Sequence, residues 1–182
     1  MRCFIAIDLE VEIKKEIKVI QEKLRKKVLF TGKFTETENL HLTLKFLGEI
    51  NEEKVEKVKK ILNKIKFNDL EVSLGEIGIF STKFPRIIWI KLSGAGLWDL
   101  QKKIDDSLKE LFPVEERFMS HVTIARIKKL GDRKEFLDYL KSIKSKNLSF
   151  RVKEFSLKKS ELFPEGPRYE DIGVYSCNNI DS

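Results

Sequence analysis

Two stretches of this chain share one pattern of residue types. Residues 41–44 read His-Leu-Thr-Leu and residues 121–124 read His-Val-Thr-Ile, and they contain the only two histidines among the 182 residues. Side chains of a β-strand point alternately to opposite faces. Each stretch therefore predicts a strand that buries its two apolar side chains and presents an imidazole and a hydroxyl together on the other face.

The chain around the two motifs repeats as well. Residues 70–77 align with residues 148–155, with their apolar positions and one glutamate in register. The apolar spacing predicts strands near residues 2–7, 41–46, 70–79, 87–92, 121–127, 148–152 and 169–176. It predicts helices near residues 13–28, 55–65, 97–111 and 136–143, with Asn51 as the N-cap of the second helix and a polar connector at residues 31–39.

Two copies of a strand-helix-strand-helix-strand unit are the simplest interpretation of this order. The copies are expected at about residues 1–85 and 86–182, within a single domain that covers residues 1–182. Each unit is expected to bury its own helices on one face of a largely antiparallel sheet, which predicts an α+β fold. The two uncovered faces would then line a shared cleft, with one histidine on each side.

Composition bears on partners and location. The net charge of +7 comes from 36 basic and 29 acidic residues; it favours a polyanionic partner such as a nucleic acid, and a well-solvated surface explains it equally well. No apolar run approaches the length that spans a bilayer, and residues 1–8 lack the features of a signal peptide. Two cysteines and two distant histidines fit no metal-ligand spacing, so a cytoplasmic protein that uses no metal is expected.

A pair of histidines with neighbouring threonines suits acid–base chemistry at a phosphodiester. The ordinary pKa of histidine, about 6.5, allows one imidazole to accept a proton while the other donates one. The threonine hydroxyls would donate hydrogen bonds to the phosphate oxygens between them. Acyl transfer would need a nucleophile, and neither motif contains a serine or cysteine to supply it. A lone histidine is more often a hydrogen-bonded core residue, but the paired pattern favours a catalytic site.

Five stretches together resemble the 2H phosphoesterase superfamily, and within it the RNA 2′,3′-cyclic phosphodiesterases, also called the 2′-5′ RNA ligase family. They read RCFIAI at residues 2–7, HLTLKFLG at 41–48, PRIIW at 85–89, HVTIAR at 121–126 and GPRY at 166–169. The resemblance implies a bilobal duplicated α+β fold with two antiparallel sheets, helices packed outside and a central cleft. It also implies a monomer that uses no cofactor and acts on RNA ends.

The resemblance assigns roles to five residues. His41 is the expected proton donor and His121 the expected proton acceptor, with Thr43, Thr123 and Arg126 binding the phosphate. Strict strand alternation places Arg126 on the face opposite His121, so its role requires a bulge, a bend or a strand end. The alternative for Arg126 is a surface salt bridge.

Three further residues are candidates for contact with RNA. Lys45 has the same strand parity as His41, and its long side chain reaches solvent as readily as a ligand. Phe84 and Tyr169, together with Phe163, are aromatic candidates for stacking on a base, although most phenylalanines of the chain must belong to the core.

The activity implied is opening of a 2′,3′-cyclic phosphate at an RNA 3′ end, which leaves a 2′-phosphate. If a 5′-hydroxyl RNA end replaces water, the same site makes a 2′-5′ linkage, so tRNA halves are candidate substrates. Two alternatives stay open: a 2H phosphoesterase that acts on a small cyclic nucleotide, and a catalytically idle RNA-binding module.

Overall fold

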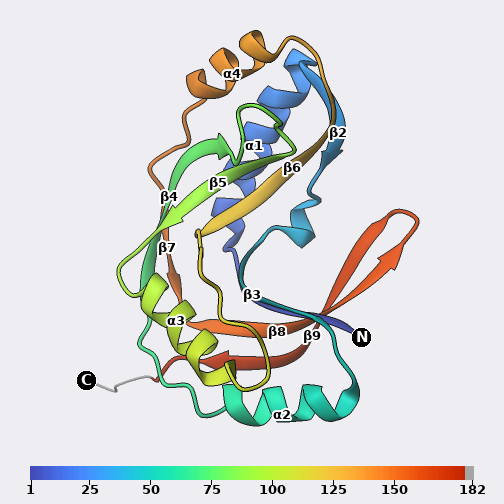
Figure 1. Ribbon diagram of the computed structural model, residues 1–182. Coiled ribbons are helices and arrows are strands. Elements are labelled where there is room, and N and C mark those ends of the chain that lie inside the picture. Colours follow the sequence, from blue (N-terminus) through green and yellow to red (C-terminus); the bar gives the residue numbers. More distant parts are fainter. Residues whose placement is uncertain (179–182) are drawn as a thin grey trace.

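The computed structural model describes residues 1–178 (Figure 1). Its strands are β1 (Arg2–Asp8), β2 (Phe30–Phe34), β3 (His41–Glu49), β4 (Leu70–Ile79), β5 (Ile87–Ser93), β6 (His121–Leu130), β7 (Ser149–Val152), β8 (Glu154–Phe163) and β9 (Gly166–Ser176). Its helices are α1 (Val11–Lys27), α2 (Glu52–Leu62), α3 (Leu97–Leu108) and α4 (Arg133–Ser142), with one 3₁₀ turn, η1 (Thr37–Asn39). The last residues of the predicted second half, 179–182, lie outside the described part of the chain.

The strands form two antiparallel sheets. One has the order β3-β1-β8-β9 and the other the order β2-β6-β5-β4-β7. Figure 1 shows the sheets one above the other, with α4 at the upper end of the molecule and α2 at the lower end. The predicted α+β fold with two antiparallel sheets is confirmed.

The two sequence halves exchange elements between the sheets, and this corrects one expectation. In the first half, β1 and β3 lie in the four-stranded sheet, whereas β4 pairs with β5 and β7 in the other sheet. In the second half, β8 leaves the five-stranded sheet and pairs with β1. The helices are divided in the same way: α3 packs on β3 and α2 on α3, whereas α1 contacts β6 and α4 contacts β4. Each half therefore does not form its own sheet, because β2 and β4 of the first half complete the five-stranded sheet and β8 and β9 of the second half complete the four-stranded sheet.

Two strands were not foreseen from the sequence. The expected polar connector at 31–39 contains β2, an edge strand whose three central residues are exposed and which pairs with β6. Its apolar pattern is weak because only Phe30 and Phe34 pack against the core. The long strand β8 begins one residue after β7, where Lys153 marks the passage from one sheet to the other.

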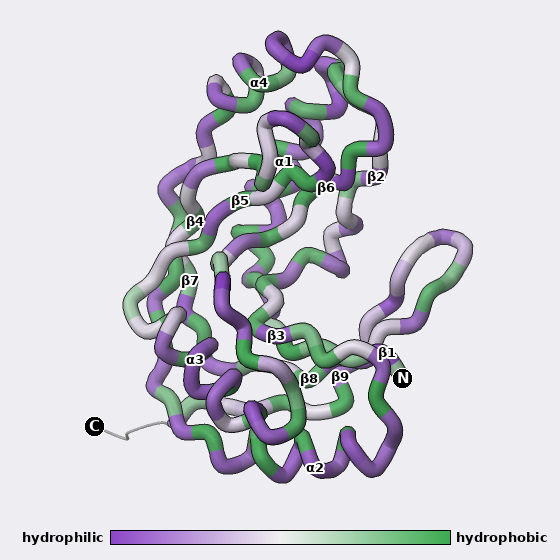
Figure 2. Tube along the Cα trace, in the orientation of Figure 1, coloured by the Kyte–Doolittle hydropathy of each residue, from purple (hydrophilic) through white to green (hydrophobic). Residues whose placement is uncertain are grey.

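Local sequence explains where the helices begin and which face they bury. The Asn51 side chain accepts a hydrogen bond of 2.9 Å from the Lys54 backbone N–H, which confirms the predicted N-cap of α2. Figure 2 shows hydrophilic and hydrophobic residues alternating along α2 and α4, as expected for helices with one face toward the core. The buried apolar side chains of both sheets and all four helices form one cluster. In the described residues, no helix is long and apolar enough to cross a membrane.

Candidate active site

The two motif histidines occupy equivalent places in different sheets. His41 is the first residue of β3 and His121 the first residue of β6. The two strands are in contact although their sheets are separate. In both strands the histidine and the threonine are half-buried while the apolar residues between and after them are buried. The predicted division of each motif into an apolar and a polar face is thus what the structure has.

Both imidazoles are held by the same kind of hydrogen bond. Nδ1 of His41 lies 2.7 Å from the Asn39 carbonyl oxygen, and Nδ1 of His121 lies 2.7 Å from the Met119 carbonyl oxygen. A carbonyl oxygen only accepts, so in each ring Nδ1 carries the hydrogen and donates it. This arrangement selects one tautomer of the neutral ring, in which Nε2 carries no hydrogen and is the atom that can take up a proton.

Thr43 completes the first motif. Its Oγ1 lies 3.0 Å from Nε2 of His41. With the imidazole neutral, the hydroxyl donates to that nitrogen; with the imidazole protonated, the nitrogen donates instead. In the second motif the Thr123 carbonyl accepts a bond of 2.8 Å from the Thr35 hydroxyl, which ties β6 to the segment between β2 and β3.

A bulge in each motif strand moves a further residue onto the histidine face. In the pairing of β6 with β5, Ala125 faces Ile88 and Thr123 faces Trp89, so that Ile124 is an extra residue in its strand. Beyond this bulge the alternation is reversed, and Arg126 is exposed on the side of His121 and Thr123. The bulge that the predicted role of Arg126 requires is therefore present.

The first motif strand has the same bulge at the equivalent position. In the pairing of β3 with β1, Lys45 faces Ile5 and Thr43 faces Ala6, so Leu44 is the extra residue. The next outward residue, Phe46, has 73% of its surface exposed and lies beside the Phe4 ring, 6.3 Å between centroids. Phe46 thus stands where Arg126 stands in the second motif.

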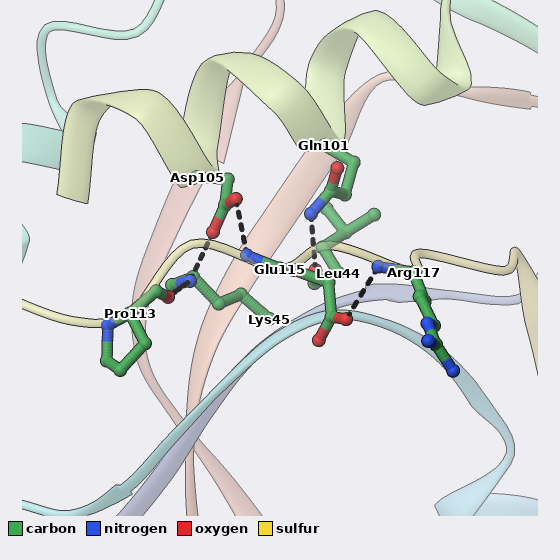
Figure 3. A network of polar contacts seen from close by, with 7 residues as sticks. All are labelled: Leu44, Lys45, Gln101, Asp105, Pro113, Glu115 and Arg117. Carbon is green, nitrogen blue, oxygen red and sulfur yellow. Dashed lines mark hydrogen bonds and ion pairs between the residues drawn. The ribbon is translucent and has the colours of Figure 1, made fainter. Parts of the chain in front are cut away.

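The bulge also corrects the prediction for Lys45. Only 6% of this residue is exposed, and its ammonium group is paired with Asp105 of α3 and donates a bond of 2.7 Å to the Pro113 carbonyl (Figure 3). Asp105 also accepts a bond of 2.8 Å from the Glu115 backbone N–H. Lys45 therefore faces the helices, away from His41, and is not available for contact with RNA.

Aromatic rings stand against both histidines. The Tyr169 ring meets His41 edge-on, with 5.3 Å between centroids, and Phe4 lies 4.9 Å from each of these two rings. On the other side, Phe80 meets His121 edge-on at 5.0 Å. Burial raises the pKa of Tyr169, and the positive charge of Arg126 acts on it in the opposite direction. Tyr169 therefore lies within electrostatic range of a residue from the other sheet.

The two remaining aromatic candidates are Phe84, in a loop, and Phe163, at the end of a strand. Phe84 is 67% exposed in the loop between β4 and β5, where its backbone N–H donates 3.1 Å to the Ser81 hydroxyl. Phe163, at the end of β8, has the Arg168 guanidinium 4.4 Å above its ring. The structure brings neither ring against a motif histidine.

The environment of His41 favours its neutral form. Burial lowers its pKa; the bond to the Asn39 carbonyl opposes this, and the positive charge of Lys158 adds to the lowering. Lys158 is itself buried and bridges two carboxylates, 2.8 Å from Asp8 and 2.7 Å from Asp171. Burial alone would lower the pKa of Lys158, but the hydrogen bonds to these carboxylates outweigh it and raise that pKa.

Some residues of the site were missed at the level of sequence. Phe46 and Phe80 were not distinguished from core phenylalanines, and the bridge centred on Lys158 was not expected. Phe46 follows the first histidine by five residues, as Arg126 follows the second, so the repeat itself contained that signal. Among the described residues, no group of three or more histidine, cysteine or acidic side chains is placed to hold a metal ion.

Comparison with known proteins agrees with this geometry. The family described as LigT like Phosphoesterase matches residues 7–89 and 92–169. A protein of Methanocaldococcus jannaschii named RNA 2′,3′-cyclic phosphodiesterase is 39% identical over 176 residues, covering 94% of this chain and 98% of the relative. A protein of the same name from Thermotoga maritima is 34% identical over 182 residues, covering 97% and 95% of the two chains.

Solved structures show the same architecture. The crystal structure of TT0787 of Thermus thermophilus superimposes with a TM-score of 0.81 at 27% identity, covering 97% of each chain. The E. coli LigT structure complexed with 3′-AMP superimposes with a TM-score of 0.79 at 25% identity, covering 98% of each. The fold and the matched residues define a phosphoesterase of the two-motif type. The chain belongs to the LigT-like 2H phosphoesterase family, as its sequence resemblance predicted.

Proposed function

We propose that this protein hydrolyses 2′,3′-cyclic phosphodiester ends of RNA to 2′-phosphomonoesters by paired-histidine acid–base catalysis. The observation that carries this proposal is the pair of imidazoles, each held through Nδ1 by a backbone carbonyl, so that Nε2 is the atom of each ring that can exchange a proton; Nε2 of His41 also contacts the Thr43 hydroxyl. The relatives from M. jannaschii and T. maritima are named for this activity, and this chain matches nearly their whole length.

The chemistry follows from the two nitrogens. Water attacks phosphorus while Nε2 of neutral His121 takes its proton. The bond from phosphorus to the 3′ oxygen breaks, and Nε2 of protonated His41 gives that oxygen its proton, which leaves a 2′-phosphate. Thr43, Thr123 and Arg126 bind the non-bridging oxygens, where negative charge grows in the transition state.

The lowered pKa of His41 fits a proton donor that becomes protonated when the substrate phosphate binds. In the free protein, burial and the charge of Lys158 disfavour the imidazolium. A phosphate anion against Nε2 favours the imidazolium, because an opposite charge at close range stabilises the charged form. Substrate binding thus places the proton on His41 at the point where it is needed.

The aromatic rings favour a nucleic acid end over a bare phosphate ester. Tyr169 and Phe4 lie against His41, and Phe46 lies beside Phe4; in our scheme the departing oxygen and its ribose are on that side. Bases stack on such rings at about 1–3 kcal/mol each. We propose RNA as the partner, including tRNA halves, with the chain acting as a cytoplasmic monomer of one domain whose central cleft holds the phosphate.

Two other functions follow from the same site. A 5′-hydroxyl RNA end in the place of water would make a 2′-5′ linkage, and a small 2′,3′-cyclic nucleotide carries the same phosphate without a chain. A substrate panel separates them: a cyclic-phosphate oligonucleotide, a cyclic mononucleotide, and the oligonucleotide with a 5′-hydroxyl acceptor. We expect the oligonucleotide to have the highest kcat/KM and hydrolysis to exceed ligation, because water is abundant.

The panel also has results that reject the proposal. Equal kcat/KM for mononucleotide and oligonucleotide would identify a small-molecule phosphoesterase. Tight RNA binding without turnover of any substrate would identify a binding module. A joined product that dominates in dilute acceptor would make ligation the main activity.

A further inference from the structure

The chain has only two glutamines, Gln21 and Gln101, and they are 80 residues apart, as are the two histidines. Gln21 lies on α1 and Gln101 on α3, the helices that follow the first strand of each half. Both side chains are buried, with 4% and 3% of the residue exposed. A buried amide among apolar side chains is costly unless it is hydrogen-bonded, so its partners indicate why it is there.

Each glutamine donates to the inserted residue of a motif bulge. Nε2 of Gln21 lies 2.9 Å from the Ile124 carbonyl oxygen, which also accepts a bond of 3.0 Å from the Thr35 backbone N–H, and 2.8 Å from the carbonyl oxygen of Thr35. Nε2 of Gln101 lies 3.5 Å from the Leu44 carbonyl oxygen, the longer of the two contacts (Figure 3). Ile124 and Leu44 are the residues left without a partner in the ladders with β5 and β1.

The contacts cross between the halves. Gln21 of the first half reaches β6 of the second, and Gln101 of the second half reaches β3 of the first. These hydrogen bonds between halves are possible because α1 packs on β6 and α3 packs on β3. Each half thus supplies the donor for the other half's motif strand.

A bulge leaves a carbonyl outside the regular ladder, and buried carbonyls need donors. At Ile124 the Thr35 backbone N–H supplies one donor, and Gln21 adds a second that it shares with the Thr35 carbonyl. Removing the glutamine donor weakens the bulge relative to the regular register, in which every later side chain moves to the opposite face. For β6 that change takes Arg126 away from His121. For β3 it takes Phe46 away from His41.

We propose that Gln21 and Gln101 are positioning residues of the active site. Gln21 holds the bulge at Ile124 that keeps Arg126 on the phosphate side, and Gln101 holds the bulge at Leu44 that keeps Phe46 on the base side. This inference rests on the proposed function for its kinetic consequences, and its geometry does not depend on turnover.

Methionine replaces glutamine at similar length without a donor, so Gln21→Met and Gln101→Met are the test variants. Gln21→Met is expected to raise KM for a cyclic-phosphate oligonucleotide by about 10- to 100-fold, the range for losing a hydrogen bond to a charged group. Gln21→Met/Arg126→Ala is expected to be no worse than Arg126→Ala alone, because both changes remove the same contact.

Gln101→Met is the matched control for that cycle. In the double variant Gln101→Met/Arg126→Ala, the two increases in KM are expected to multiply. In Gln101→Met/Phe46→Ala, KM is expected to equal that of Phe46→Ala alone. Gln21→Glu tests the donor directly. Its carboxyl group, facing two carbonyl oxygens, stays protonated and keeps one donor, so its KM is expected between those of the parent and Gln21→Met.

The inference is wrong if both methionine variants lower the unfolding temperature while KM and kcat stay unchanged, or if Gln21→Met and Arg126→Ala multiply. A titration with inorganic phosphate separates this result from a failure of the proposed function. If the parent does not hydrolyse the RNA but Gln21→Met weakens phosphate binding as Arg126→Ala does, the function is wrong and the positioning role stands. If Gln21→Met does not fold, the Gln21→Glu variant decides by the same titration with and without Arg126.

Discussion

At the scale of the residue, His41 links stability to pH. Its pKa in the folded protein lies below the ordinary value because burial disfavours the imidazolium. Between that pKa and about 6.5, the unfolded chain binds more protons at this site than the folded protein. Stability from this group is therefore complete above pH 6.5 or so and is lost as the pH falls toward the folded-state pKa.

His41→Gln is expected to remove this part of the pH dependence. Urea unfolding of the parent and the variant between about pH 5 and 8 measures it: the parent loses stability on acidification more steeply than His41→Gln. His121→Gln is the control for the substitution itself, because it keeps His41 and its contribution to the pH dependence. Parallel curves for the parent and His41→Gln would contradict the buried, neutral state of His41.

Phe46 offers a second prediction at this scale. Phe46→Ala should raise KM for a cyclic-phosphate oligonucleotide by roughly 5- to 150-fold, the range of one lost base stack. Inhibition by inorganic phosphate should not change, because no base is involved. Phe84→Ala is the matched control, an exposed ring away from both histidines. An equal effect of both variants, or a loss of phosphate affinity in Phe46→Ala, would count against stacking at Phe46.

Sequence reasoning placed His41 with Thr43 and His121 with Thr123 on one face of their strands, because a period of two describes a strand up to its first irregularity. It failed for Lys45, whose parity with His41 is reversed by the bulge at Leu44. No local signal announces such a bulge, since the donors that its carbonyl accepts come from residues far away in the sequence. For Arg126 a bulge or a similar irregularity had to be assumed, and the family resemblance supplied the reason to assume it.

At the scale of the element, one buried ion pair joins β3, α3 and the loop that leads into β6. Lys45 binds Asp105 and the Pro113 carbonyl, and Asp105 accepts the Glu115 N–H (Figure 3). A buried pair stabilises little relative to apolar residues, but a single partner left alone is costly. This pair therefore fixes the geometry of the segment before His121 more than it adds to overall stability.

Asp105→Leu is expected to destabilise the protein by about 3–5 kcal/mol, because it leaves the Lys45 ammonium buried and unpaired. Adding Lys45→Met should recover part of this loss, since the double variant buries no charge. Denaturant unfolding of the three proteins gives both numbers. The account of this pair is wrong if Lys45→Met makes the Asp105 variant less stable.

The two unforeseen strands show a limit of pattern reading at this scale. The weak alternation in β2 reads as a connector, and only its pairing with β6 makes it a strand. A single residue separates β7 from β8, so the chain passes from one sheet to the other where the sequence pattern shows no break between strands. Both features depend on long-range pairing, which no window along the sequence contains.

At the scale of the whole molecule, the exchange of strands makes the halves dependent on each other. A fragment of residues 1–85 keeps β4 without its neighbours β5 and β7, and β1 without β8. A fragment of residues 86–182 loses the complementary partners. Neither fragment is expected to fold cooperatively alone, and an equimolar mixture should regain cooperative unfolding. Circular dichroism during thermal unfolding checks this; a cooperative transition in either fragment alone would show that the halves are independent units.

The central claim concerns the paired imidazoles, and product identification tests it most directly. A short RNA with a 2′,3′-cyclic phosphate end is incubated with the protein in EDTA, and the product ends are identified by mass and by phosphatase sensitivity against synthetic 2′- and 3′-phosphate standards. The account predicts a 2′-phosphate from the parent, and loss of most turnover in folded His41→Ala and in folded His121→Ala. A 3′-phosphate product would mean that the departing oxygen is misassigned. Turnover that survives in both histidine variants would contradict the mechanism itself.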